Sequence, residues 1–169
     1  GGAISVPGAF SLASGTATIN SPLTLSGAGT WSGGTLTGSG SLTVANGATL
    51  ALNGGTKNLG TLSLVNNGTV NWSAGGVNVV GNSTFTNNGL FDVQGNHTWG
   101  NASDWAPAGN YHNSTLSYST AFTNGAGGTI RKSAGTGAAT LGNYTSLYGC
   151  GSYYCNNQNY YGYFNLANN

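Results

Sequence analysis

The chain has 169 residues, a formal net charge of +1 and only 3% charged residues, namely three basic and two acidic side chains. So few basic residues exclude a nucleic-acid-binding role, because displacing counterions from a phosphate backbone requires several lysines or arginines per site. No apolar run approaches the roughly 18 residues of a membrane-spanning helix, and we therefore expect no membrane insertion.

Residues 1–16, GGAISVPGAFSLASGT, precede the regular pattern of the chain. Their apolar residues alternate with small or polar ones, and such a period of two is typical of a strand with one buried face. We expect this segment to add a strand that caps the fold or joins it to another chain. The alternating residues are Ile4, Val6, Phe10 and Leu12.

A sequence-similar unit of about 20 residues recurs from residue 17 to residue 142. Each unit places a short apolar segment on either side of a corner rich in glycine and asparagine. These residues accept the left-handed backbone region, so such corners make tight bends between strands. The four clearest units are LTLSGAGTWSGG (23–34), LTVANGATLALNGG (42–55), LSLVNNGTVNWSAGG (62–76) and FTNNGLFDVQGN (85–96).

An Asn-Gly corner between two strands is also typical of a β-hairpin, and a run of hairpins would form an antiparallel sandwich or barrel. A unit of this length, with three short strands and three corners, better fits one coil of a parallel β-solenoid, or β-helix. The third strand of each coil falls in the KNLG or VNVVG segment, with Leu59 and Val79 pointing inward. The predicted fold is therefore all-β.

Stacked coils bring equivalent side chains into ladders along the inside of a solenoid. Aligning the units on their corners predicts two such inward ladders. The first contains Leu25, Val44, Leu64 and Phe85, and the second contains Trp31, Leu50, Val70 and Phe91. The outward positions fall to Thr, Ser and Asn, whose side chains can hydrogen-bond along the stack.

The segments GATLALNGG, NNGTVNWSAGG, NNGLFDVQGN and AGGTIRKSAGTGAATL resemble the β-strand repeats of large secreted bacterial surface proteins. These adhesin-like proteins are related in architecture to autotransporter passengers and filamentous-haemagglutinin-type solenoids. The resemblance covers about residues 17–96 and 120–142. It implies a secreted, extracellular or cell-surface β-solenoid with a structural or adhesive role, and it carries over no catalytic residues.

Residues 97–119 depart from the repeat and gather histidine, tryptophan and tyrosine. Aromatic faces beside polar side chains bind sugars, so this excursion is a candidate binding site for surface polysaccharide. The alternative is that its aromatic residues only cover one flank of the solenoid. We expect the repeat to resume near Phe122. The candidate ligand-binding residues are Trp99, Trp105, Tyr111 and His112.

The chain offers little for catalysis or for holding a cofactor. It has no glutamate, and Asp92 should point outward and alone, between inward Phe91 and Val93. A pair of carboxylates with Asp104 would therefore arise only by accident of folding. We expect no enzyme activity, no metal site and no cofactor.

Residues 143–169 switch to a tyrosine-rich composition that contains both cysteines. Cys150 and Cys155 are predicted to form a disulfide, which implies an oxidising compartment; the alternative is two free thiols in a reduced cell. Their spacing is unusual for zinc, and no second pair completes a site. Because terminal repeats of solenoids are usually atypical, we expect this segment to be a disulfide-clipped C-terminal cap.

These features predict a structural subunit of an extracellular filament or surface fibre. The ends of a solenoid expose strand edges, and the chain carries no charged residue before Lys57 that would discourage pairing at its first strands. Its main partner would then be a second copy, added head to tail into an open fibre. The alternative is a monomeric adhesive or carbohydrate-binding module that acts through residues 97–119.

Overall fold

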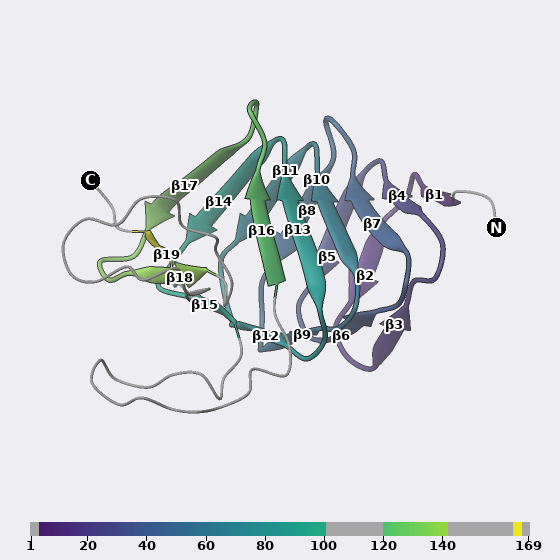
Figure 1. The fold of residues 1–169 in the computed structure, drawn as a ribbon, viewed down its shortest axis with the longest axis horizontal. Helices are drawn as coiled ribbons and strands as arrows, with labels where there is room; N and C mark the ends of the chain where they lie inside the picture. The colour runs from purple at the N-terminus through teal and green to yellow at the C-terminus, as the bar shows by residue number, and fades with distance from the viewer. Residues whose placement is uncertain (1–3, 101–119, 142–163, 167–169) are drawn as a thin grey trace, which may run out of the picture.

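The computed structural model describes residues 4–100, 120–141 and 164–166, with side chains described in the first two ranges. Within these ranges the chain forms strands joined by turns and bends, and it contains no helix that could cross a membrane. Up to residue 141, successive strands go in turn to three sheets, so each coil adds one strand to each sheet (Figure 1). The predicted parallel β-solenoid is confirmed.

The three faces of the solenoid are named sheets A, B and C here. Sheet A contains β1 (Ile4–Val6), β4 (Leu23–Leu25), β7 (Ser41–Val44), β10 (Ser63–Asn66), β13 (Ser83–Asn87) and β16 (Thr120–Asn124). Sheet B contains β2 (Phe10–Leu12), β5 (Ala28–Trp31), β8 (Thr49–Leu52), β11 (Thr69–Trp72), β14 (Leu90–Gln94) and β17 (Thr129–Ala134). Sheet C contains β3 (Thr16–Thr18), β6 (Gly34–Thr37), β9 (Lys57–Leu59), β12 (Val77–Val79), β15 (Thr98–Gly100), β18 (Ala139–Leu141) and β19 (Phe164–Leu166).

The pairing within these sheets excludes the hairpin alternative. The strands on either side of an Asn-Gly corner, such as β7 and β8, belong to different sheets and do not pair with each other. Among the described strands every neighbouring pair is parallel except β18 and β19.

The regular coils begin earlier than the sequence pattern indicates. We expected the repeat from residue 17, but β1, β2 and β3 already form one complete coil. Ile4 pairs with Leu23 and Thr16 pairs with Thr35, both at an offset of 19 residues. The corners of this first coil lack the Asn-Gly signal, so an alignment on corners misses it.

The first predicted inward ladder combines residues from two separate ladders. All four of its residues are buried, which confirms their inward orientation, but Val44 pairs with Asn66 and not with Leu64. The corner after β7 holds four residues, Ala45–Ala48, whereas the corner after β10 holds two, so an alignment on corners shifts the register by two residues. The observed ladders are Ile4, Leu23, Leu42, Leu64, Phe85, Phe122 and Val6, Leu25, Val44, Asn66, Asn87, Asn124.

The second predicted ladder is correct except for Trp31, which lies opposite Leu52 and not Leu50. The residue opposite Leu50 is Gly29, where an added Cβ would approach the side chain of Leu25 to 2.6 Å, so a larger residue would require Leu25 to shift. The observed ladders are Phe10, Gly29, Leu50, Val70, Phe91, Ile130 and Leu12, Trp31, Leu52, Trp72, Val93, Lys132.

Sheet C and the outward faces follow the prediction. Leu59 and Val79 are buried and pair in register, as expected of the third strand. On the outside, the hydroxyl of Thr84 donates to that of Ser63 at 3.0 Å. Such bonds between coils replace bonds to water on a surface that carries few charges.

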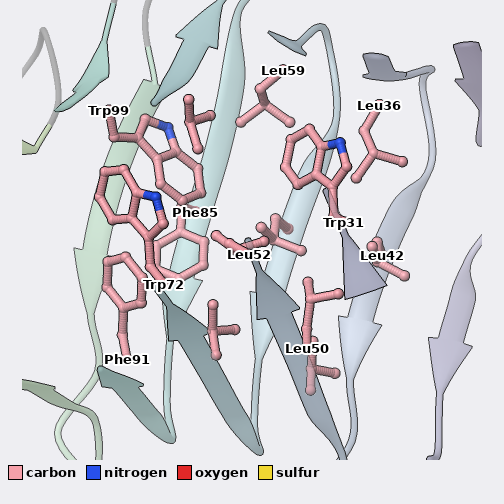
Figure 2. Packing of buried hydrophobic residues seen from close by; sticks show 14 of the residues in the cluster. Trp31, Leu36, Leu42, Leu50, Leu52, Leu59, Trp72, Phe85, Phe91 and Trp99 are labelled. Atoms are coloured by element: carbon pink, nitrogen blue, oxygen red, sulfur yellow. The ribbon is translucent and has the colours of Figure 1, made fainter. Parts of the chain in front are cut away.

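The interior changes character along the stack (Figure 2). Leucines surround Trp31 in the earlier coils, whereas aromatic side chains fill the later ones. The ring of Trp72 stacks on Phe91 with centroids 6.0 Å apart and meets Trp99 edge-on at 5.7 Å. Aromatic pairs of this kind stabilise a core by about 0.5–1.5 kcal/mol beyond their area burial.

A ladder of three asparagines, of which Asn66 and Asn87 are buried and Asn124 is exposed, lines the corner between sheets A and B. Asn66 donates to the side-chain oxygen of Asn87 at 2.8 Å, and Asn87 donates to that of Asn124 at 2.7 Å. The same amides also donate to the backbone carbonyls of Leu90 and Thr129. The ladder therefore connects the corners of successive coils through side-chain bonds to side chains and to the backbone.

The repeat resumes as predicted, because Phe122 in β16 pairs with Phe85 in β13. The departure from the coil begins later than expected: residues 98–100 form β15, and Trp99 continues the ladder of Val77.

Candidate functional site at the ends of the solenoid

The N-terminal end of the solenoid presents one edge of each sheet. Within the described residues, β1, β2 and β3 are the terminal strands and pair on one side only. The amide of Ile4 donates to the carbonyl of Pro22 (2.9 Å), and the carbonyl of Val6 accepts from Ser26 (3.2 Å). Successive residues of a parallel strand direct their backbone groups to opposite sides, so the N–H and C=O of Ser5 point toward the open edge.

This end also exposes the end of the hydrophobic core. Ile4, whose exposed fraction is 56%, begins the ladder that continues with buried Leu42 and Leu64. Phe10 is half-buried and begins the ladder of Leu50. The sequence has no charged residue before Lys57. The N-terminal end is therefore apolar, uncharged and bounded by strand edges.

The C-terminal end is formed by β16, β17 and β18. In the described part of the chain β16 and β17 are the terminal strands of sheets A and B. Their inward residues Phe122 and Ile130 are half-buried. In sheet C, β19 pairs with β18 in the antiparallel direction and so covers the third edge.

Asp92 is not alone, contrary to the prediction. Its exposed fraction is 3%, and it accepts from Arg131 through Nε (3.1 Å) and Nη2 (2.8 Å) and from Gln94 at 3.0 Å. The hydrogen bonds from Arg131 lower the pKa of Asp92 to about 2 against the opposing effect of burial. This ion pair connects β14 to β17, the last strand of sheet B.

Two lysines point into the solenoid at the corner between sheets B and C. Lys57 is fully buried, and its Nζ donates to the carbonyls of Gly55 (2.8 Å) and Ala74 (2.9 Å). Burial lowers the pKa of Lys57 to about 8. The Nζ of Lys132 donates to Ala134 and Gly135 in the same way, at 2.6 and 2.7 Å.

Trp99 is part of the core and is not a ligand-binding surface. It is fully buried, and its ring meets those of Trp72 and Phe122 edge-on at 5.7 and 5.2 Å. Its neighbour His97 packs on Trp72 with centroids 5.1 Å apart, and burial lowers the pKa of His97. The other predicted residues, Trp105, Tyr111, His112, Cys150 and Cys155, lie outside the described residues.

A shallow open hollow of about 230 Å³ runs along the corner between sheets C and A. It is lined by Gly38–Gly40, Thr61–Ser63, Asn82 and Thr84. No charged side chain lines it, and it offers no acid, base or nucleophile of unusual reactivity.

The features that sequence reasoning missed are the inward lysines, the asparagine ladder and the covering strand β19. The sequence does indicate the inward orientation of Lys57, since it lies two residues before inward Leu59 in the same strand. No such signal existed for the direction of β19. Comparison of this chain with protein-family models, with curated proteins and with solved structures finds no match.

Proposed function

We propose that this chain is a structural subunit of an extracellular bacterial filament or surface fibre, in which copies join head to tail through the ends of the solenoid. The observation that supports this function is the continuity of two inward ladders between the two ends. Ile4 and Phe122 are the first and last residues of one ladder, and Phe10 and Ile130 are the first and last residues of another.

Stacking one copy on the next would extend both ladders with apolar side chains. Phe122 of one copy would meet Ile4 of the next, at the strand spacing of about 4.8 Å that separates coils within the chain. The joint would bury half-exposed apolar area and satisfy backbone groups at the open edges. A head-to-tail contact of this kind does not close, so it produces a fibre.

The adhesive alternative receives less support. Its argument depends on aromatic side chains that face solvent, and Trp99 is fully buried. The remaining candidate residues of that site lie outside the described residues.

The test is assembly of the full chain with a charge placed at the joint. Ile4→Lys introduces an inward-pointing charge, a device that prevents strand edges from pairing. Because Ile4 is 56% exposed in the single chain, this substitution should leave folding nearly unchanged. Ser5→Lys is the matched control, since it adds the same charge one residue away on the outer face.

We expect fibres in negative-stain images of the native chain and of Ser5→Lys, and a monomer by size exclusion for Ile4→Lys. A native chain that remains a 16.8 kDa monomer at high concentration would contradict the proposed function.

A further inference from the structure

The direction of β19 sets it apart from every other described strand. It pairs antiparallel with β18, with Ala139 opposite Leu166 and Leu141 opposite Phe164. A strand that reverses direction at the end of a parallel stack cannot be the start of another coil. It ends sheet C on this side.

The backbone groups of β18 show which bonds β19 uses. The amide of Thr140 donates to the carbonyl of His97 at 2.9 Å, so Thr140 is bonded back to the preceding coil. Ala139 and Leu141 therefore direct their N–H and C=O groups toward β19. Leu166 is therefore hydrogen-bonded to Ala139, and Phe164 to Leu141, through their backbones. The backbone groups of Asn165 point away from β18.

The edge that β19 covers is also the place where a second copy would add its third strand. A copy stacked head to tail brings β1 to β16 and β2 to β17, and the same placement brings β3 to β18. Within the described residues, β16 and β17 have open edges, so β19 is the one strand that stands in the way.

The charged residues at this end do not prevent stacking. Arg131 is bound back to Asp92 in the preceding coil. The inward Lys132 has a precedent in the fully buried Lys57, which binds carbonyls at its own corner and at that of the next coil. An inward lysine at this corner is thus compatible with a further coil above it.

We propose that β19 is a removable cap: it occupies the site on β18 that binds β3 of a second copy, and head-to-tail addition requires its displacement. This inference rests on the proposed function. Among the described residues β19 pairs at one sheet edge, whereas an incoming coil would pair at three, so a chain that docks β1 and β2 can displace it.

Two proline substitutions in the full chain test the cap. Leu166→Pro removes a backbone donor that bonds to β18, whereas the control Asn165→Pro removes one that points away from it. We expect Leu166→Pro to assemble about fivefold faster than the native chain, the factor that corresponds to one backbone hydrogen bond, and Asn165→Pro to assemble at the native rate. Circular dichroism checks that both variants keep their strands.

A peptide provides a second measurement. A synthetic peptide of residues 160–169, added to Leu166→Pro, should return its assembly to the native rate. Equal rates for all three chains, or slower assembly of Leu166→Pro that the peptide does not alter, would overturn the cap while leaving the proposed function intact. No assembly by any of the chains would remove the proposed function and this inference together.

Discussion

The buried ammonium of Lys57 donates to the carbonyl oxygen of Ala74, 17 residues later in the chain and one coil further along the stack, at 2.9 Å. A side chain of one coil thereby satisfies the backbone of the next. Burying a charge is unfavourable unless it is hydrogen-bonded, and here the carbonyls at the corner provide those bonds. The charge nevertheless makes the stability of the solenoid depend on pH.

Stability should rise with pH in the alkaline range because of Lys57. Its pKa is lowered from 10.5 to about 8, so between these values the unfolded chain binds a proton that the folded chain does not. Unfolding therefore becomes less favourable as pH rises through this window, and below about pH 8 the contribution is a constant destabilisation. Between pH 8 and 9.5 the gain should be about 1.5 kcal/mol, measured by urea denaturation.

The matched variants for this effect are Lys57→Met and Lys132→Met. The stability of Lys57→Met should not increase between pH 8 and 9.5, whereas that of Lys132→Met should increase as in the native chain. A rise of equal size in Lys57→Met would show that another group is responsible.

Acid should weaken the contact between β14 and β17. The pKa of Asp92 is lowered from 3.8 to about 2, so its stabilising contribution is complete above about pH 4 and is lost as pH falls toward 2. Asp92→Asn and Arg131→Gln should each remove this part of the acid dependence, as measured by thermal melts from pH 5 to pH 2. If the two substitutions are additive in a double-mutant cycle, the ion pair does not couple these strands.

The spacing of apolar residues predicts the coils and the inward faces well, because alternation is a local property. It does not predict the register, since corners of different length look alike. An alignment on corners places Val44 with Leu64, but the corner after Val44 has two more residues, so Val44 pairs with Asn66. Composition also misleads at Trp99, which lies among aromatic residues in the sequence yet continues the core ladder of Val77.

Lys57 and β19 illustrate a second limit of prediction from sequence, namely contacts between distant segments. The alternation that places Leu59 inside also places Lys57 inside, but the carbonyl that accepts its bond comes from another coil, and the sequence does not reveal it. The antiparallel direction of β19 is a property of its pairing with β18, which local spacing does not determine.

Substitutions at two corner glycines can distinguish the cost of backbone strain from the cost of crowding between coils. Gly47 and Gly75 both have positive φ, 81° and 66°, but a Cβ at Gly47 would meet nothing within 4 Å, whereas one at Gly75 would collide with the carbonyl of Gly55 in the adjacent coil. Gly47→Ala should destabilise by about 1 kcal/mol, from the left-handed conformation alone. Gly75→Ala should lose about 2 kcal/mol more, because two coils must separate. Equal losses in chemical denaturation would mean that the coils adjust freely at this corner.

The asparagine ladder should contribute more to stability than the asparagines on the surface beside it. Asn87 is fully buried, accepts from Asn66 and donates to Asn124 and to the carbonyl of Thr129. Asn87→Leu would remove all of these bonds at a fully buried position, and we expect a loss of about 3 kcal/mol. The neighbouring Asn88 is exposed, and its side chain donates to Asn67 at 2.9 Å. Since water replaces that bond, Asn88→Leu should cost less than about 1 kcal/mol. Urea denaturation of both variants measures the difference; similar losses would indicate that the buried ladder adds nothing beyond a surface hydrogen bond.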